Sequence, residues 1–490
     1  MLKVYKNYID GKWISSSSGK TFASLNPSNE KPLGKFQASN HEDVDKAVET
    51  AEKAYYSWSY TPAPKRGEIL LKVAQLLRKD KERLARIMVN EMGKVIKETM
   101  GDVQEAIDIF EYMAGEGRRL FGFTTPSELK DKFCMTIRSP IGVVGLITPW
   151  NFPIAIPAWK ISTALICGNT IVFKPSSDTP LCAIELVKIL IKAGVPNGVV
   201  NLVTGSGSEV GTPIITHQKI RAISFTGSRD TGLFITQKAG LKKVGLELGG
   251  KNAIIVMDDA DLDLAVDGII WGAFGTTGQR CTACSRIIVH KKVKERLERK
   301  LLHGIKKLKL GYGADKKTEV GPLINSAAVE KTHKYTLIGL DEGARLLCGG
   351  KIASKKGYFY EPTLFTDVKP NMRIAQEEIF GPTTSIIAIN NLNEAIEVCN
   401  GVIYGLSSAI YTNDIRNALK AIERIEAGIV YVNSSTIGAE VHLPFGGMKE
   451  TGNGTREAGI TGIEEFSEVK TVYIDYSGVL QKAQGIDKKI

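Results

Sequence analysis

The sequence has few cysteines and no long apolar run. Seven cysteines in 490 residues match no disulfide framework, which suits a reducing compartment and makes any special cysteine a candidate reactive thiol. No stretch approaches about 18 uninterrupted apolar residues, the length of a membrane span. The first residues also lack the apolar core of a secretory signal. We therefore expect a cytoplasmic protein without a membrane partner.

Long runs of one charge sign are also missing. The net charge is +11, but Lys and Arg are scattered among acidic residues, with no basic run of five or more. Solvated surface lysines explain the excess better than nucleic-acid binding, although the excess can still attract anionic cofactors and substrates. The six histidines are dispersed, so we predict no metal and no nucleic-acid partner.

The chain is long enough for two or three domains, and it alternates β-branched runs with amphipathic stretches. From about residue 140, the predicted strands are 141–147, 169–175, 199–205, 222–228 and 252–257. The helices predicted between them are 155–167, 180–193, 208–217 and 230–239. This alternation predicts a parallel, doubly wound sheet of the α/β class.

The flanking regions complete this organisation. Residues 42–118 predict two or three long helices that cover one face of the sheet. Residues 260–450 repeat the alternation and predict a second α/β domain, with strands near 286–290, 383–389 and 427–433. Two further strands, 132–139 and 469–476, are isolated from both units. They are expected to pair with each other or with another subunit.

Two glycine-rich stretches follow predicted strands. The first contains Gly207 and Gly211, and the second contains Gly227 and Ser228. Each can bring backbone N–H groups close to a pyrophosphate at a helix N-terminus. Neither matches G-x-G-x-x-G, and one glycine loop alone is usually turn chemistry. Two such loops at the strand ends of one sheet favour a dinucleotide site.

A lysine ends one of the predicted strands. Lys174 should emerge at the carboxyl edge of the sheet, where ligands bind in open α/β folds. Ser177 follows it and adds a hydroxyl group without negative charge. Because an acid there would repel a 2′-phosphate, this pattern favours tolerance of NADP.

The candidate nucleophile is Cys281, which follows a flexible loop and lies next to Arg280. A neighbouring cation favours the thiolate, although a cysteine is more often a small core residue. Cys281 and Cys284 also form a C-x-x-C pair, which would suit zinc or a redox couple. No second pair completes a tetrahedral metal site.

Two further polar residues have the chemistry to support a nucleophile. Glu247 lies between two leucines, and an apolar setting raises the pKa of a carboxylate, so that it can act as a base near neutral pH. A solvated edge-strand acid is the alternative. Asn151 follows the first strand, where its amide can donate to an oxyanion or simply form a turn.

Six motifs occur together in an order and spacing that resemble the aldehyde dehydrogenase superfamily, over nearly the whole chain. They lie at residues 148–153, 225–228, 247–251, 278–281, 378–382 and 444–447. Glu247 precedes Cys281 by 34 positions, which is also the family's interval between base and nucleophile.

The resemblance implies a Rossmann-like doubly wound cofactor domain, a second α/β catalytic domain and a small β oligomerisation arm. Residues 1–118 and 141–248 would form the dinucleotide-binding domain and 249–449 the catalytic domain. The arm and C-terminal segment would comprise 119–140 and 450–490. A homodimer or homotetramer is expected.

The resemblance also implies a mechanism. Cys281 attacks the aldehyde, and the oxyanion is held by the Asn151 amide and the Cys281 N–H group. Hydride passes to the nicotinamide, and Glu247 activates the water that hydrolyses the thioester. Lys160 and Glu457 match the family's proton-relay positions. A phosphorylating or CoA-acylating dehydrogenase would need protection from this water, and a non-catalytic binding protein would not need these residues.

Cofactor and substrate contacts follow from the same motif matching. The cofactor, NADP or NAD, would contact Thr148, Trp150, Lys174, Ser177, Gly207, Gly211, Gly227, Ser228, Leu248, Glu378 and Phe380. NAD-preferring members often have an acid at the Ser177 position, so NADP is expected to be tolerated or preferred. The substrate would contact Phe152, Arg280, Gly438, Ala439 and Phe445.

Arg280 is the main clue to the substrate, because a guanidinium can bind a carboxylate, although it can instead only support its loop. The motifs around it resemble branches that act on carboxylated semialdehydes such as 2,5-dioxopentanoate. Succinate or aminoadipate semialdehyde, or a broad range of aldehydes, remain the alternatives.

Overall fold

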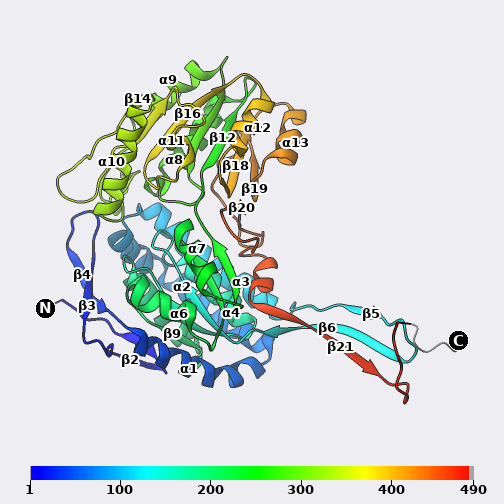
Figure 1. Cartoon of the computed structure of the whole chain (residues 1–490). Helices are drawn as coiled ribbons and strands as arrows, with labels where there is room; N and C mark the ends of the chain where they lie inside the picture. The colour runs from blue at the N-terminus through cyan, green and yellow to red at the C-terminus, as the bar shows by residue number, and fades with distance from the viewer. Residues whose placement is uncertain (1, 485–490) are drawn as a thin grey trace.

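The computed structural model of the chain describes residues 2–484. Two α/β units are each built on a seven-stranded sheet, and a three-stranded sheet projects from the lower unit as an arm (Figure 1). The predicted α/β class is confirmed.

The first sheet is the predicted doubly wound sheet. In spatial order its strands are β11 (Lys243–Glu247), β10 (Ile220–Thr226), β7 (Val143–Ile147), β8 (Thr170–Lys174), β9 (Val200–Leu202), β1 (Asn7–Ile9) and β2 (Lys12–Ile14). The strands from β11 to β9 are parallel, whereas β1 and β2 add an antiparallel edge that the sequence analysis did not predict.

The centre of this sheet is covered on both faces. Ile171 and Phe173 of β8 belong to one hydrophobic core and Val172 to another, because successive side chains of a strand point to opposite faces. The first core contains α2 (Ala63–Met92), α3 (Ile96–Glu116), α4 (Ala155–Ile166) and α5 (Pro180–Ala193). The second contains α1 (His41–Tyr60), η1 (Gly207–Gly211), α6 (Thr212–Thr216) and α7 (Arg229–Lys238).

The long N-terminal helices have clear end signals. Helix α1 begins with a capping box, in which the Asn40 side chain accepts from the Asp43 backbone and the Asp43 side chain accepts in return. Helix α2 ends at Gly93, which is left-handed. The prediction of two or three long helices in residues 42–118 is confirmed. The expectation that they cover one face of the sheet is wrong, because α1 packs mainly into one core while α2 and α3 pack into the other.

The second sheet carries the other half of the molecule. In spatial order its strands are β14 (Arg345–Cys348), β15 (Thr363–Thr366), β16 (Thr383–Ile389), β13 (Cys284–His290), β12 (Asn252–Val256), β18 (Ser407–Tyr411) and β19 (Ile429–Val432). Its helices are α8 (Leu262–Phe274), η2 (Gly275–Gly278), α9 (Lys294–Ile305), α10 (Ser326–Asp341), α11 (Arg373–Gln376), α12 (Leu392–Asn400) and α13 (Ile415–Arg424).

The strand pattern assigned one strand, at residues 252–257, to the wrong sheet. It grouped these residues with the first sheet, whereas the family resemblance put them in the domain 249–449. In the structure β12 pairs with β13 and β18 of the second sheet. A fully buried apolar strand suits the centre of either sheet, so its composition does not reveal its neighbours.

The remaining strands include the arm. Strands β21 (Ser467–Asp475) and β6 (Lys132–Pro140) pair antiparallel, and β5 (Thr124–Pro126) pairs with β6. The predicted pairing of the two isolated strands is therefore confirmed. Short elements complete the chain: β3 (Thr21–Leu25), β4 (Pro32–Gln37), β17 (Tyr404–Gly405), β20 (Met448–Lys449) and α14 (Thr461–Glu465).

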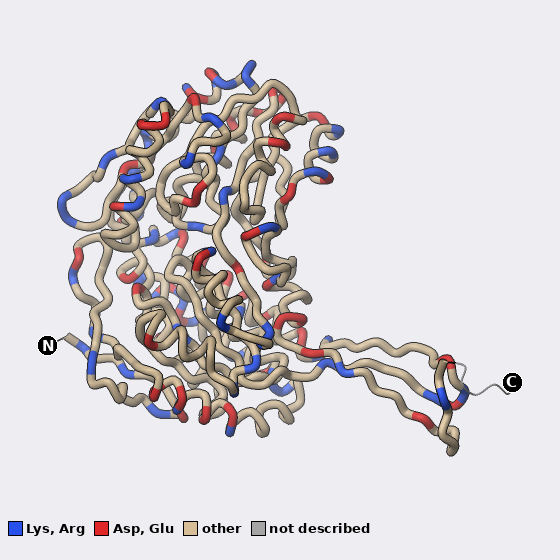
Figure 2. The backbone as a smooth tube through the Cα atoms, viewed as in Figure 1, with Lys and Arg blue, Asp and Glu red and all other residues tan. Residues whose placement is uncertain are grey.

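Charged residues of both signs are interspersed over both units (Figure 2). Among residues 2–484, no helix combines the length and the apolar character needed to cross a membrane.

Candidate active site

Cys281 lies in the loop between η2 and β13, and the backbone before it is strained. Thr276 and Thr277 have φ values of 53° and 58°, a conformation that β-branched residues rarely adopt. The Thr276 N–H group donates to Glu98 Oε1 at 2.7 Å, and Thr277 Oγ1 donates to the Gly321 carbonyl at 3.0 Å. These bonds hold the strained turn, as is typical of functional sites.

The backbone of Cys281 itself is also fixed. Asn252 Nδ2 donates to the Cys281 carbonyl at 2.7 Å. A Cβ atom at Gly250 would lie 2.3 Å from this carbonyl oxygen, so only glycine permits the approach. The start of β12 therefore positions the nucleophile loop.

Asn151 is buried beside this loop. Its Nδ2 atom donates to the Gln279 carbonyl at 3.1 Å, and it lines the same cavity as Cys281. One N–H of the amide holds the loop, and the second is left for a ligand.

Glu247 is the last residue of β11, an edge strand, yet its side chain is buried. Neither carboxylate oxygen has a hydrogen-bond partner within residues 2–484. Burial, followed by the charge of Glu457, raises the pKa of Glu247 well above its usual value. The solvated-acid alternative is therefore wrong.

A buried network lies next to Glu247. Lys160 Nζ forms an ion pair with Glu457 and donates to Ser224 Oγ at 2.8 Å. The Glu457 backbone is fixed by two 2.7 Å hydrogen bonds with Phe445. The structure thus brings Lys160 and Glu457 together with Glu247, as expected from the motif matching.

Two cavities meet at Cys281. One of about 230 Å³ and one of about 120 Å³ share four lining residues, namely Ile156, Thr226, Leu248 and Cys281. A reacting carbon bonded to Cys281 would therefore be reachable from both sides.

The larger cavity has the features of a nicotinamide site. Six of the predicted cofactor residues line it: Trp150, Gly227, Ser228, Leu248, Glu378 and Phe380. Trp150 and Phe380 pack edge to face with ring centroids 5.4 Å apart. The Glu378 carboxylate accepts from the Gly250 N–H group at 2.8 Å, so an acid suited to ribose hydroxyls is held at the wall. Ser228 also caps the N-terminus of α7.

The other predicted cofactor residues form a second cluster outside this cavity. Thr148 N–H donates to the Lys174 carbonyl, Gly211 lies beside the Lys174 side chain, and Ser177 Oγ donates to the Gly205 carbonyl at 2.9 Å. Gly207 is in the same segment, at the start of η1. Burial lowers the pKa of Lys174 to about 8.

Asp178 is an acid near Lys174 that the sequence analysis did not consider. Its carboxylate accepts from Asn325 Nδ2 at 3.2 Å and raises the pKa of Lys174, against the larger effect of burial. Negative charge is therefore present close to Ser177, which weakens the sequence argument for NADP.

All five predicted substrate residues line the smaller cavity: Phe152, Arg280, Gly438, Ala439 and Phe445. Glu247 and Glu457 line it too. Arg280 Nε donates to Thr276 Oγ1 at 2.8 Å, and its Nη2 lies 3.5 Å from Glu98 Oε1. Arg280 therefore both supports the loop and faces the cavity.

Helix α3 contributes charged residues that the sequence analysis treated only as part of a surface-packed helix. Glu98, Asp102 and Glu105 repeat at i, i+4 and i+7, which places them on one helix face. Glu105 lines the smaller cavity, and Asp102 forms a buried ion pair with Lys94 at 2.8 Å. The helical spacing of these acids was the available signal.

Arg280 favours the Cys281 thiolate, as expected, but other effects outweigh it in the free protein. Burial raises the pKa of Cys281 to about 12, and Glu378 and Glu247 act in the same direction. Arg280 lowers this pKa, but it is the smallest of the causes. Cys281 is therefore a thiol at neutral pH in the free protein.

Cys281 and Cys284 of the C-x-x-C motif do not form a disulfide. Cys284 is buried in β13, where its thiol donates to the Arg286 carbonyl, and both cysteines are free. Within residues 2–484, no group of three His, Cys, Asp or Glu side chains could hold a metal ion.

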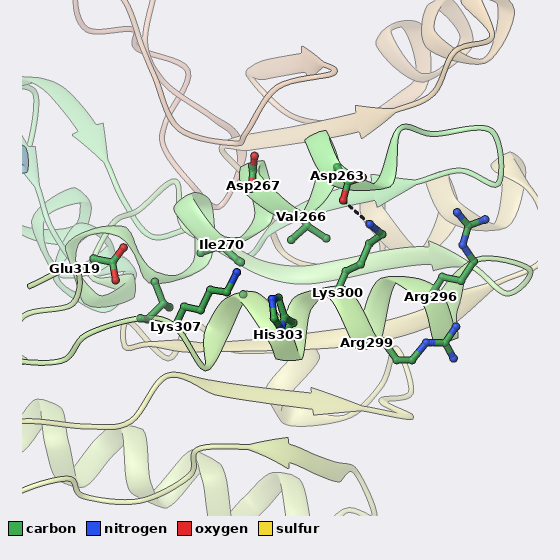
Figure 3. Close-up of a pocket in the computed structure, with 12 residues that line it drawn as sticks. Asp263, Val266, Asp267, Ile270, Arg296, Arg299, Lys300, His303, Lys307 and Glu319 are labelled. Atoms are coloured by element: carbon green, nitrogen blue, oxygen red, sulfur yellow. Dashed lines mark hydrogen bonds and ion pairs between the residues drawn. The ribbon is translucent and has the colours of Figure 1, made fainter. Parts of the chain in front are cut away.

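A larger cavity of about 660 Å³ lies between α8 and α9, and none of its lining residues belongs to the two cavities at Cys281. In Figure 3, Lys300 turns toward Asp263, with which it forms an ion pair, while Arg299 extends away from α8. This groove has the mixed charges of a solvated surface.

Comparison with known proteins agrees with the geometry of the site. The aldehyde dehydrogenase family profile matches residues 13–472. The chain is 43% identical over 479 residues to an alpha-ketoglutarate semialdehyde dehydrogenase from Haloferax volcanii, which covers 96% of this chain and 99% of that protein. It is 41% identical to a 2,5-dioxopentanoate dehydrogenase from Saccharolobus solfataricus, over 96% of this chain and 99% of that protein.

A solved structure is similar over almost the whole length. Betaine aldehyde dehydrogenase from Staphylococcus aureus, crystallised in complex with NAD⁺, has a TM-score of 0.95 and 36% identity, and the match covers 98% of this chain and 96% of that one. The resemblance stated from the motifs is therefore confirmed, and the chain belongs to the aldehyde dehydrogenase family of NAD(P)-dependent oxidoreductases.

Proposed function

We propose that this protein oxidises a carboxylated semialdehyde to the carboxylic acid with NAD or NADP, through a thioester on Cys281. One observation carries this proposal. Cys281 stands where two cavities meet, with Glu378 in one and with Arg280 and Glu247 in the other.

The first half of the reaction forms the carbon–sulfur bond. The Cys281 thiol first gives its proton to a solvent water molecule. The thiolate sulfur then attacks the aldehyde carbon, and the carbonyl oxygen becomes an oxyanion. The free N–H of the Asn151 amide and the Cys281 backbone N–H group hold that oxyanion. A bound nicotinamide supplies the acceptor for the hydride that leaves this carbon. The product on the protein is a thioester.

The second half is hydrolysis. Glu247 removes a proton from a water molecule, whose oxygen attacks the thioester carbon, and the C–S bond breaks to release the acid and the thiol. Because its carboxylate has no hydrogen-bond partner among the described residues, Glu247 is available for this proton. The Glu457 carboxylate, which is paired with Lys160 and lines the same cavity, accepts this proton from Glu247. Retained Glu247 argues against acyl-CoA or acyl-phosphate formation.

The residues present fit a dinucleotide. The larger cavity would hold the nicotinamide ribose on Glu378, with Gly227 and Ser228 at the N-terminus of α7 close to the pyrophosphate. The cluster around Lys174 and Ser177 would hold the adenosine ribose. NAD and NADP are both expected to bind, because Lys174 favours a 2′-phosphate and Asp178 opposes it.

The substrate assignment rests on Arg280 and on the relatives. Arg280 lines the smaller cavity and supplies a cation for a carboxylate. The named activities of the Haloferax and Saccharolobus proteins concern such a substrate. We therefore favour 2,5-dioxopentanoate over succinate or aminoadipate semialdehyde, and over a broad range of neutral aldehydes.

The arm supports assembly into a homodimer or homotetramer. It exposes apolar side chains along its strands: Phe133, Ile137, Val469, Tyr473 and Ile474. Exposed apolar patches of this kind mark protein contacts. We further propose a cytoplasmic location and the domain boundaries 1–118 with 141–248, 249–449, and 119–140 with 450–490. Light scattering after size exclusion should give a multiple of 53.4 kDa, and a monomer would contradict this assembly.

A substrate panel tests the proposed function. Purified protein should form NAD(P)H faster with carboxylated semialdehydes than with neutral aldehydes of the same length. Arg280→Ala should raise KM for the acidic substrates at least about tenfold, as expected for a lost charged hydrogen bond, while leaving neutral aldehydes little changed. Equal effects on both classes, or a wild-type preference for neutral aldehydes, would contradict the substrate assignment.

A further inference from the structure

We propose that Glu105 is a specificity-determining residue of the substrate cavity. Its neutral carboxyl group donates a hydrogen bond to the oxygen on the carbon next to the substrate carboxylate. The cavity would therefore select 2-oxo acid semialdehydes over those with an unsubstituted carbon at that position. This inference rests on the proposed function, because it needs a carboxylated substrate with its aldehyde at Cys281.

The three acids on one face of α3 have different partners. Glu98 holds the Thr276 backbone and lies near Arg280. Asp102 binds Lys94 and also accepts from the Ala155 N–H group at 2.8 Å. Glu105 lines the substrate cavity with Arg280 and Cys281. No hydrogen bond or ion pair of its carboxyl group is found among residues 2–484, so this acid is free to bind a ligand.

Glu105 and Arg280 offer different chemistry to one substrate. Arg280 is a cation, and two of its nitrogens already contact Thr276 and Glu98, which leaves Nη1 for a substrate carboxylate. An ionised Glu105 in the same small cavity would repel that carboxylate. A protonated Glu105 would instead provide an O–H donor.

The surroundings favour the protonated form. Glu105 is half-buried. Desolvation, Asp102 and Asp108 raise its pKa, Lys94 and Arg280 lower it, and the net result is a pKa raised to about 8. The acids Glu247 and Glu457 and the thiol of Cys281 face the same cavity. A substrate carboxylate adds another negative charge and disfavours ionisation further. Glu105 is thus mostly a donor at neutral pH.

A protonated Glu105 carboxyl group distinguishes between substituents on the substrate carbon next to the carboxylate. A 2-oxo group accepts the hydrogen bond. A methylene group leaves the Glu105 carboxyl group without a partner in the occupied cavity, and a site built to bind an oxygen discriminates against such an analogue. A 2-ammonium group would need the ionised acid. The 2-oxo acid is therefore the class that fits both Arg280 and Glu105.

The test compares 2,5-dioxopentanoate with 5-oxopentanoate, which differs only in lacking the 2-oxo oxygen. The wild-type protein should favour the first by about tenfold in kcat/KM, the worth of one good hydrogen bond. Glu105→Leu should remove this preference by lowering kcat/KM for 2,5-dioxopentanoate alone. Glu105→Gln should keep it, since an amide N–H also donates.

A pH profile gives an independent readout. The wild-type preference should fall as pH rises through about 8, where Glu105 loses its proton, whereas that of Glu105→Gln should not change. The inference is overturned if Glu105→Leu slows both substrates equally, or if Glu105→Gln shows the wild-type pH profile. If Glu105→Leu does not fold, the Glu105→Gln profile decides. A wild-type protein that prefers neutral aldehydes would refute the proposed function instead.

Discussion

The side-chain amide of Asn151 donates a hydrogen bond of 3.1 Å to the backbone carbonyl of Gln279, two residues before Cys281. Asn151 follows β7 of the first sheet, and Gln279 precedes β13 of the second. This bond therefore joins the two halves of the molecule at the point where the chemistry is proposed. Asn151 also lines the cavity beside Cys281, and the second N–H of its amide is left for a ligand.

Asn151→Ala should lower kcat by about 10²–10³-fold, as is typical when one oxyanion donor is removed. KM should change much less, because the donor acts on charge that develops only during the reaction. Stopped-flow measurement of NAD(P)H formation in a single turnover checks this. A comparable rise in KM with kcat unchanged would instead assign Asn151 to substrate binding.

Ser177→Glu should shift cofactor use toward NAD. The new carboxylate would lie in the cluster around Lys174 and repel a 2′-phosphate, so kcat/KM for NADP should fall at least about tenfold while that for NAD is maintained. Ser177→Ala is the matched control. It removes the hydrogen bond to the Gly205 carbonyl without adding charge, and it should affect both cofactors alike. If Ser177→Glu lowers kcat/KM equally for NADP and NAD, the proposed role of this position in cofactor choice is refuted.

Alkylation of Cys281 in the free protein should accelerate as pH rises. Its pKa is raised to about 12, so the thiolate fraction grows about tenfold per pH unit throughout the neutral and mildly alkaline range. Iodoacetamide labelling followed by peptide mass spectrometry measures the rate. Cys284→Ala should show the same pH dependence of labelling, because the Cys284 thiol is buried and donates a hydrogen bond to the Arg286 carbonyl. A labelling rate that is already maximal at neutral pH would contradict the raised pKa.

Asp102→Asn should destabilise the protein strongly. Lys94 and Asp102 pair at 2.8 Å with both side chains fully buried, and leaving one such charge alone typically costs about 3–5 kcal/mol. Burial already lowers the pKa of Lys94. The loss of stability should therefore be largest at low pH, where Lys94 is charged, and should shrink as pH rises toward the ordinary pKa of lysine. Thermal unfolding at several pH values measures this.

An exposed pair provides the control for that experiment. Lys65 and Glu68 lie 2.9 Å apart with both side chains more than half exposed. Glu68→Gln should leave the melting temperature almost unchanged, because solvent screens exposed pairs. Equal effects of Glu68→Gln and Asp102→Asn would refute the special role of burial.

The sequence predicted the framework well, because the framework depends on local patterns. The continuous apolar run of β8 is buried on both faces, and this pattern alone indicates a central parallel strand. Its composition did not reveal which sheet contains β12, since sheet membership depends on distant partners. The motif around Cys281 predicts a candidate nucleophile, but it does not predict the left-handed conformation of Thr276 and Thr277, which side-chain propensity opposes.

Residues that face a cavity from a long helix were harder to predict. Glu105 belongs to a charged helix, and its sequence context resembles that of a solvated surface. Only the packing of α3 against the loop of Arg280 turns it toward the substrate. The pKa of Cys281 was wrongly judged for a related reason, since burial and two distant carboxylates outweigh the adjacent arginine.

The most direct test of the central claim is a single-turnover experiment on Glu247→Gln with mass spectrometry of the quenched protein. If Cys281 carries the thioester and Glu247 activates the water, the variant should release a burst of about one NAD(P)H per subunit, followed by slow turnover. The acyl mass should be found on the peptide that contains Cys281. Wild-type turnover in this variant, or a burst without an adduct on Cys281, would contradict the account.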